Sequence, residues 1–420
     1  MTGKIQEFLS YNTLLADVQR NLMNNYFASK YGHAPGTELF TYDASHSYEV
    51  FGMGRLNATS HIVSRGTGLV LIDEPQSLDE GDYIMIGHDN GNKDTWTTNN
   101  LPAGYTGVER LEREWKVDKT NDIGDIRIAV DTSGLPARPA GYDNYILFID
   151  DDGDLGNGGT NAVVLDQRFG TYVRKSNISL NDGNVFFIGV GRNISVQDGN
   201  WNDPATWLLN VPSADEDVTV SHNVTLTANT QVGGLIINSA SGVLNVGSYN
   251  FDITVGTIDT VAGGNINPGT GTVIYSADAA QCIESLIYNN LTVRGNGTKT
   301  LCGDIVVTGD LTIFESVTTL DADAANNYSI TLNGDWQSNG TFNAQNGKVL
   351  FDGTAAQEIN RNTGDNEIFY DLEIGTNSQI ITDHNIQVRD TLLMNGGNFI
   401  LTSGKSTYHR RGCYQQGDTC

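Results

Sequence analysis

Residues 271–293 read GTVIYSADAAQCIESLIYNNLTV, in which short strand-like runs alternate with polar turns. A second copy at 347–374 keeps the same order: GKVLF replaces GTVIY, AQEI replaces AQCI, and FYDLEI replaces YNNLTV. Similar strands follow both copies, GDLTI at 309–313 and RDTLL at 389–393. We interpret these segments as a unit of several coils that is used twice. The alternative is convergence within a β-rich sequence.

The same pattern extends outward from this stretch and covers residues 194–401. Lys and Arg are rare in this region, and Gly or Asn lies between most of the strand runs. Short strands that stack on the equivalent strand of the next coil predict a β-solenoid, which we expect to be a right-handed parallel β-helix. The runs are Val218–Val220, Val224–Leu226, Leu235–Ile237, Val243–Val246, Ile253–Val255, Val273–Tyr275, Leu291–Val293, Ile305–Val307, Leu311–Ile313, Ile330–Leu332, Val349–Phe351, Leu372–Ile374, Ile386–Val388 and Leu392–Met394.

Residues 34–193 contain longer strand-like runs, which turn residues such as Ser133-Gly134 separate. About seven strands over this length are typical of an antiparallel β-sandwich. The runs are Tyr48–Met53, Gly68–Ile72, Tyr83–Ile86, Glu112–Val117, Asp125–Val130, Tyr145–Ile149 and Asn184–Val190. The chain is therefore predicted to be all-β, a sandwich followed by a solenoid.

The two ends of the chain differ from these regions. Residues 1–33 predict a strand at Ile5–Tyr11 and the one helix, which Asn12 or Thr13 would cap and Tyr31-Gly32 would close. One strand and one helix cannot form a core alone, so we expect 1–33 to pack on a segment downstream or on a part of the protein that has been cut away. Residues 402–420 break the solenoid pattern, contain Cys413 and Cys420, and predict an irregular tail.

The composition limits the partners. The chain has 24 Lys and Arg against 50 Asp and Glu, a formal net charge of −26, which repels nucleic acid and anionic membranes. No apolar run approaches the roughly 20 residues of a membrane span, so we expect no membrane insertion. Thr2-Gly3-Lys4-Ile5 does not resemble a signal peptide. If the protein is secreted, this chain is expected to be an internal fragment of it.

The acidic segment Asp150-Asp151-Asp152-Gly153-Asp154 follows an apolar strand. Asp150, Asp152 and Asp154 alternate, which can place three carboxylates on one side of the chain. Such dense hard oxygen ligands favour Ca²⁺, and Asn157 and Asp166 could complete the site. The alternative is a solvated acidic turn.

Two further pairs of residues could have a special role. Trp201 and Trp207 flank Asp203-Pro204 and could stack on sugar rings, although we favour a hydrophobic cap on the end of the solenoid. Cys282 and Cys302 could form a disulfide if they lie on neighbouring coils; two unpaired thiols are the alternative. No cysteine pair has the CxxC spacing of a zinc or redox site.

No catalytic residues are predicted. The sequence has no Ser-His-Asp pattern, nucleophile elbow, HExxH motif or phosphate loop. Carboxylate pairs such as Asp321 and Asp323 are common in so acidic a chain, and basic partners in the solenoid region are few. A carbohydrate-active enzyme would need acidic side chains close to each other and to a basic residue in one groove.

Three segments resemble parts of large adhesin-like surface proteins that bacteria export by type IX secretion. Residues 5–32 resemble the closing strand and helix of a concanavalin-A-like (laminin-G-like) lectin domain. FGMGR at 51–55, LEREWKV at 111–117 and YILFIDDDGD at 145–154 resemble a β-sandwich module that follows such domains. GNWNDPATW at 199–207 resembles the opening of G8-like β-helix domains. Most of the lectin domain is absent, so no lectin activity is carried over.

This resemblance implies an extracellular or cell-surface location and adhesion, without a known ligand. We therefore expect a non-enzymatic surface protein whose solenoid displays other domains or binds a polysaccharide or cell-surface ligand. The alternatives are a carbohydrate-binding module that serves an enzyme elsewhere in the parent protein, and a polysaccharide-active β-helix enzyme.

Overall fold

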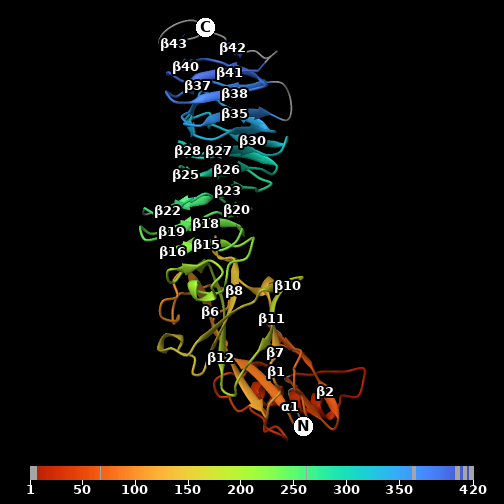
Figure 1. The fold of residues 1–420 in the computed structure, drawn as a ribbon. Helices are drawn as coiled ribbons and strands as arrows, with labels where there is room; N and C mark the ends of the chain where they lie inside the picture. The colour runs from red at the N-terminus through yellow and green to blue at the C-terminus, as the bar shows by residue number, and fades with distance from the viewer. Residues whose placement is uncertain are drawn as a thin grey trace. The chain divides into compact units, whose positions relative to one another are not determined.

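The computed structural model describes residues 7–66, 68–261, 263–361, 366–402, 407–409 and 414–415. It divides into two compact units, residues 1–192 and 193–420. The first unit is antiparallel and the second is a parallel β-solenoid of about ten coils (Figure 1). The predicted fold class is therefore confirmed.

The first unit is a sandwich of two antiparallel sheets. Its core consists of side chains from both sheets, among them Ile86, Trp115 and Phe186 from one and Ile72 and Ile128 from the other. The larger sheet has the order β2 (Thr59–His61), β1 (Tyr48–Leu56), β5 (Tyr83–His88), β6 (Val108–Thr120), β12 (Val185–Gly191), β8 (Asn144–Asp150) and β9 (Asn161–Val164). The smaller has the order β10 (Gln167–Phe169), β11 (Tyr172–Ile178), β7 (Ile126–Asp131), β4 (Val70–Asp73) and β3 (Val63–Arg65).

Helix α1 (Asp17–Tyr31) covers the outer face of the larger sheet. Val18 and Leu22 pack with Tyr83 and Met85, because alternate side chains of β5 point to opposite faces of the sheet. Buried Asn25 fixes the following segment: its Nδ2 donates to the Thr37 carbonyl at 2.9 Å, and its Oδ1 accepts from the Leu39 backbone N–H at 2.8 Å. The helix is thus part of the sandwich unit.

The predicted start of this helix was wrong. The N-cap is Ala16, whose N–H donates to the Gln19 side chain at 3.0 Å, rather than Asn12 or Thr13. Residues 7–11 form no strand; Ile5 and Gln6 lie outside the described residues. A strand requires a hydrogen-bonded neighbour, whereas Glu7 binds the helix through Lys30 at 2.8 Å and Tyr31 at 2.7 Å. Gly32, with a φ of 68°, ends the helix as predicted.

The second unit has three faces, and each coil crosses them in the same order. The first face contains β13 (Asn193–Ile194), β15 (Asp217–Val220), β18 (Gly234–Ile237), β21 (Ile258–Thr260), β24 (Gln281–Ile283), β27 (Gly297–Leu301), β30 (Thr318–Asp321), β33 (Thr341–Asn343), β36 (Asn366–Phe369), β39 (Asn385–Val388) and β42 (Thr407–His409). The second contains β14 (Gly199–Asn200), β16 (Asn223–Thr225), β19 (Val243–Asn245), β22 (Asn265–Asn267), β25 (Ile287–Tyr288), β28 (Ile305–Val307), β31 (Ile330–Leu332), β34 (Lys348–Phe351), β37 (Asp371–Ile374), β40 (Leu392–Met394) and β43 (Tyr414–Gln415). The third contains β17 (Thr230–Val232), β20 (Asn250–Ile253), β23 (Thr272–Tyr275), β26 (Asn290–Val293), β29 (Leu311–Ile313), β32 (Trp336–Ser338), β35 (Ala356–Arg361), β38 (Gln379–Thr382) and β41 (Asn398–Leu401). Short 3-10 turns are η1 (Thr132–Gly134), η2 (Leu155–Asn157) and η3 (Pro204–Thr206).

Inward side chains form stacked ladders inside the solenoid. On the third face Phe251 pairs with Val273, Val273 with Leu291, and Leu291 with Leu311. All four side chains are fully buried. Most of the strands whose side chains the structure describes therefore contribute one or two buried apolar side chains to a continuous core, and outward side chains alternate with them.

The three faces differ in continuity. The third face is one uninterrupted sheet of nine strands, from β17 to β41. Among the described residues, no strand pairing joins β21 to β24 on the first face or β22 to β25 on the second. The first face has another interruption, between β33 and β36. Of the residues described at the junction between 257 and 288, only those of the third face therefore carry a backbone ladder from one coil to the next.

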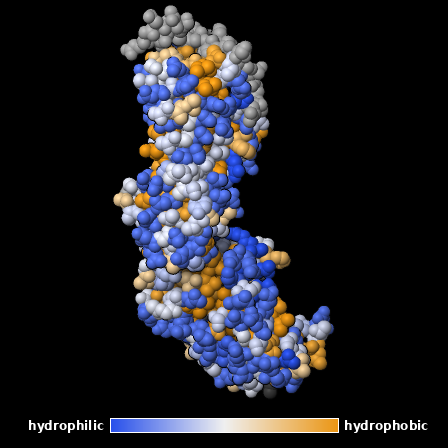
Figure 2. Space-filling model, viewed as in Figure 1, coloured by the Kyte–Doolittle hydropathy of each residue, from blue (hydrophilic) through white to orange (hydrophobic). Residues whose placement is uncertain are grey.

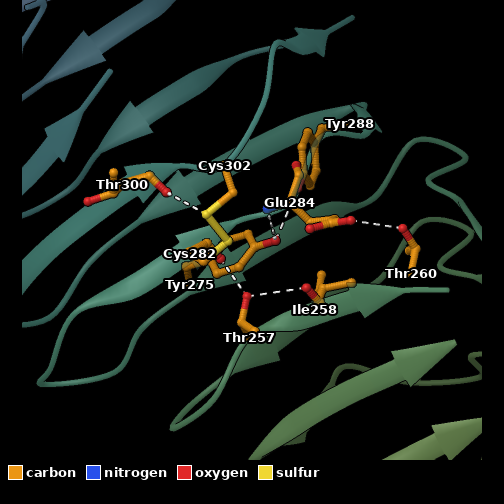
Figure 3. The surroundings of a disulfide bond; sticks show 9 residues. All are labelled: Thr257, Ile258, Thr260, Tyr275, Cys282, Glu284, Tyr288, Thr300 and Cys302. Carbon is orange, nitrogen blue, oxygen red and sulfur yellow. Dashed lines mark hydrogen bonds between the residues drawn. A yellow bond between two sulfur atoms is a disulfide. The ribbon is translucent and has the colours of Figure 1, made fainter. Parts of the chain in front are cut away.

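Side chains bridge this junction (Figure 3). Thr257 Oγ1 donates to the Cys282 carbonyl at 2.5 Å, and Thr260 Oγ1 donates to Glu284 Oε1 at 2.9 Å. Gln281 reaches from β24 to the preceding coil, where its Nε2 donates to the carbonyls of Ile253 at 3.1 Å and Gly256 at 2.8 Å. These bonds replace part of the missing ladder.

The two copies of the sequence repeat make equivalent contacts but lie on different faces. Gln357 donates to the carbonyls of Leu332 at 3.1 Å and Gly334 at 2.7 Å, as Gln281 does in the first copy. The first copy begins at β23 on the third face, and the second begins at β34 on the second face. The second copy is therefore turned about the solenoid by one face relative to the first.

The predicted irregular tail was wrong in part. Strands β42 and β43 lie within residues 402–420 and pair with β39 and β40, so they continue the first and second faces. Cys413 and Cys420 lie outside the described residues. No helix in the described ranges has the length and apolar character that crossing a bilayer requires.

Candidate functional site

A groove of about 690 Å³ runs over the outer surface of the third face. Outward side chains of successive strands and the turns after them form it, because residues alternate between core and solvent along each strand. Most of these side chains are amides and hydroxyls. The lining residues are Asn250, Thr272, Ile274, Thr292, Arg294, Thr312, Phe314, Gln337, Ser338, Asn339, Asn360, Asp383 and His384.

The register of the sheet aligns the lining residues in a column. Ile274 pairs with Thr292, Thr292 with Thr312, Thr312 with Gln337, and Gln337 with Asn360. Each residue therefore lies one strand spacing, about 4.8 Å, from the next. The column offers one hydroxyl or amide per coil at four consecutive coils.

Carboxylates lie against both basic groups in the groove. Arg294 Nη2 contacts Asp252 Oδ2 at 2.5 Å, and Ser276 Oγ donates to the other oxygen of this buried carboxylate. His384 Nδ1 lies 2.5 Å from Asp383 Oδ1. Of the described residues that line the groove, Asp383 is the one carboxylate. The groove surface is consequently polar with little net charge.

Phe314 places a phenyl ring in this polar groove, with 53% of the residue exposed. Leu311 and Ile313 point into the core, so alternation along the chain directs Phe314 outward. An exposed aromatic ring among hydroxyl and amide groups can stack on the apolar face of a sugar. Phe314 was not among the predicted binding residues, although this alternation was the signal that could have found it.

The acidic segment forms a tight loop in the first unit. Asp150 accepts hydrogen bonds from the backbone N–H groups of Asp152 at 3.0 Å and Gly153 at 2.9 Å. Asp152 accepts from the N–H of Asp154 at 2.9 Å and from Asn157 Nδ2 at 3.0 Å, and these two donors lower the pKa of its carboxyl. The carboxylates thus stabilise the turn through backbone N–H groups.

The other predicted calcium ligands are engaged separately. Asp154 accepts from the Gly156 backbone N–H at 3.1 Å, and Asp166 pairs with Lys175 of β11 at 2.5 Å. In the residues that the structure describes, no group of three or more His, Cys, Asp or Glu side chains is placed to hold a metal ion. Each carboxylate can accept further bonds, so calcium binding stays a prediction.

Trp201 and Trp207 lie in the core at the first coils of the solenoid. They are 1% and 4% exposed, their rings meet edge to face at 4.8 Å, and Trp201 also contacts Phe251. Trp207 Nε1 donates to the Trp201 carbonyl at 2.7 Å. Neither ring offers a free face to a sugar, and both fit the alternative of an apolar end cap.

Cys282 and Cys302 are joined in a disulfide, with their Cα atoms 5.7 Å apart (Figure 3). They lie on β24 and just after β27, two neighbouring strands of the first face. The bond therefore connects two successive coils immediately after the junction.

Other ionisable groups inside the solenoid have structural partners. Burial raises the pKa of Glu367, although Arg361, 2.7 Å away, opposes this shift. Burial lowers the pKa of Lys299, whose Nζ donates to the carbonyls of Ala277 at 2.6 Å and Ala279 at 2.9 Å. Burial also raises the pKa of Tyr275 and of Tyr288, whose hydroxyls are 3.0 Å apart. None of these groups lines the groove.

A second cavity, of about 370 Å³, lies in the first unit between α1 and β1. Leu22 and Met23 of the helix and Val50 and Phe51 of the sheet are among the residues that line it. Its walls are mainly apolar, as expected where a helix packs on a sheet, and burial lowers the pKa of His61 at its edge.

The comparisons with known proteins concern the first unit. Residues 69–184 match a family described as a domain of unknown function, DUF8202. The match begins just before β4 and ends just before β12, so it lies within the sandwich. No curated protein and no solved structure matches the chain.

Proposed function

We propose that this chain belongs to an extracellular surface protein that binds carbohydrate along the third face of its solenoid and is not an enzyme. The observation that carries the proposal is the groove of amide and hydroxyl side chains with the exposed ring of Phe314. Hydrogen-bonding groups around an aromatic ring are complementary to a sugar, which has hydroxyl edges and apolar faces.

The charges in the groove favour binding over hydrolysis. Glycoside hydrolases use two carboxyl groups on opposite sides of the scissile bond. Asp383 is the one carboxylate among the described lining residues, and Arg294 lies against buried Asp252. A polysaccharide-active enzyme is the second candidate, favoured only by the position of a groove along a parallel β-solenoid.

Two observations support an extracellular location. The disulfide between Cys282 and Cys302 would persist in an oxidising compartment. The net charge of −26 and the mainly hydrophilic face of the solenoid in Figure 2 suit a soluble extracellular protein that meets divalent cations. The acidic loop of the first unit is proposed to bind calcium in that environment, where millimolar calcium is available.

The proposal is tested by incubating the protein with a panel of soluble and insoluble polysaccharides, measuring both retained protein and released sugar. We expect retention without release. The Phe314→Ala variant should lose most of the retention, because it removes the stacking surface. Val317→Ala is the matched control, since Val317 is 60% exposed and does not line the groove.

Two results would contradict the proposal. Equal retention of the wild type and Phe314→Ala would show that binding occurs elsewhere. Release of sugar would favour the enzyme, and Asp383→Asn would then test the groove carboxylate. Circular dichroism and melting of each variant establish that the change at the surface leaves the fold intact.

A further inference from the structure

We infer that the groove ligand is an uncharged linear polysaccharide whose chain runs along the solenoid axis, one sugar residue per coil or nearly so. This inference rests on the proposed function and names the class of glycan. It follows from three features of the third face: its unbroken register, the pairing of its charges, and the position of Phe314.

The unbroken register makes the groove long and periodic. The column from Ile274 to Asn360 covers four strand steps, or about 19 Å. Asn250 and His384 line the groove one coil beyond each end, which extends it to about 29 Å. A compact ligand, or a single sugar at the end of a glycan, would occupy only a small part of this length.

The step of the column suits an extended sugar chain. In an extended 1,4-linked polysaccharide, one residue advances by a distance close to the spacing between neighbouring β-strands. Successive sugars would therefore meet Thr292, Thr312 and Gln337 in turn, each with hydrogen-bonding capacity of the same kind. The groove lies on the third face, whose strand ladder is unbroken from β17 to β41, so this step is kept along its whole length.

The charges in the groove favour an uncharged chain. Recognition of uronic acids or sulfated sugars relies on cationic side chains that are available to the anion. Here Arg294 is held by Asp252, and His384 lies beside Asp383. The net charge of −26 adds a general repulsion of polyanions.

Phe314 lies near the middle of the groove. It follows Ile313, which pairs with Val293 and with Ser338, so Arg294 and Asn339 occupy the corresponding positions on the adjacent coils. One ring would thus stack on one sugar, and polar groups would bind the residues on either side. Affinity would then depend on the central sugar and grow with the number of neighbours.

The test measures affinity by calorimetry for neutral β-1,4-linked oligosaccharides of glucose, xylose and mannose, from the disaccharide to the octasaccharide. Oligogalacturonates of the same lengths are the charged counterparts. We expect affinity for a neutral series to rise by at least about tenfold from the trisaccharide to the hexasaccharide and then level off. Oligogalacturonates should bind at least about tenfold more weakly at every length.

A variant at the end of the column gives an internal check. Asn360→Ala should weaken binding of the hexasaccharide several-fold and leave binding of the trisaccharide unchanged, since short ligands can remain over Phe314. Val317→Ala should alter neither.

The possible failures separate the two proposals. Binding that does not change with ligand length, or that is tighter and salt-sensitive for oligogalacturonates, would overturn this inference and leave carbohydrate binding in place. The absence of binding to any glycan, including the polymers, would overturn both.

Discussion

The first and third faces of the solenoid reach the same junction in different ways. The third face crosses it as an unbroken backbone ladder, whereas the first face stops at β21 and resumes at β24. Gln281, Thr257 and Thr260 provide bonds between coils where the first face has no strand pairing. At this junction the backbone ladder of the third face connects the two coils, and side-chain hydrogen bonds take the place of the missing ladder on the first face. The regular face is the one that carries the groove.

The largest expected effect on stability comes from replacing the equivalent glutamines of the two repeat copies, and the two variants should differ in how far the damage spreads. Gln281→Ala and Gln357→Ala each remove hydrogen bonds to buried backbone groups, at a cost of about 2–4 kcal/mol. β35, which contains Gln357, pairs on both sides, whereas β24 pairs only with β27 in the part of the chain that the structure describes. Hydrogen exchange should therefore accelerate across β24 and β25 in Gln281→Ala and stay local in Gln357→Ala. Equal spread in both variants would mean that the interrupted ladder has no energetic consequence.

The disulfide gives the next largest effect. It closes a loop with a sequence separation of 20, so its removal should lower the free energy of unfolding of the solenoid by about 3 kcal/mol. The measurement compares chemical unfolding of the wild type and the double variant Cys282→Ala, Cys302→Ala. A reducing agent should destabilise the wild type and leave the double variant unchanged. Equal stability of the two proteins would show that the other contacts hold these coils without the bond.

The tyrosine pair at the junction should make the solenoid sensitive to alkali. Burial raises the pKa of Tyr275 and Tyr288 above the value of about 10 in the unfolded chain. Their contribution to stability is therefore fully present below pH 10 and is lost as the pH rises above it, by about 1.4 kcal/mol per pH unit for each tyrosine. Between pH 9 and pH 11 the melting point of the double variant Tyr275→Phe, Tyr288→Phe should fall less steeply than that of the wild type. If the melting points of the two proteins fall equally with pH, these hydroxyls are not the cause of the loss of stability in alkali.

The smallest effect concerns the acidic loop and extends the comparison to the first unit. A site with the affinity usual for extracellular calcium modules would stabilise the sandwich by about 0.6–2 kcal/mol in 2 mM calcium. Calcium should raise the melting point of the wild type relative to EDTA and have less effect on Asp152→Asn. Equal midpoints in calcium and EDTA would show that the loop, with carboxylates already bonded to backbone N–H groups, needs no ion.

The sequence predicted the core strands well because their patterns are local. All seven runs of the sandwich correspond to strands, and so do the aliphatic runs of the solenoid except Ile253–Val255, of which only Ile253 belongs to a strand, β20. The missed strands include polar triplets such as Asn265–Asn267 and Trp336–Ser338, in which a single large apolar side chain points inward, and also the longer β11 of the sandwich. Alternation over three residues with one apolar member cannot be distinguished from a turn.

The groove could not be predicted because its residues come from different coils. Thr292, Thr312 and Gln337 become neighbours only through the register between strands, and the coils vary in length. The alternating aspartates predicted the acidic loop. They did not predict that backbone N–H groups of the loop would donate hydrogen bonds to its carboxylates. Burial of Trp201 likewise depends on Phe251, which lies two coils further along the chain.

The displaced repeat has a consequence for how such a chain can diversify. Because each coil uses three strands, a duplicated segment that inserts a whole number of coils would return every position to the same side of the rod. The second copy instead starts on another side. Inward residues that the two copies share, such as the two bridging glutamines, keep the same surroundings, while outward residues at matching positions are presented to different surroundings. A repeat displaced by one face thus separates the requirements of the interior from those of the exterior.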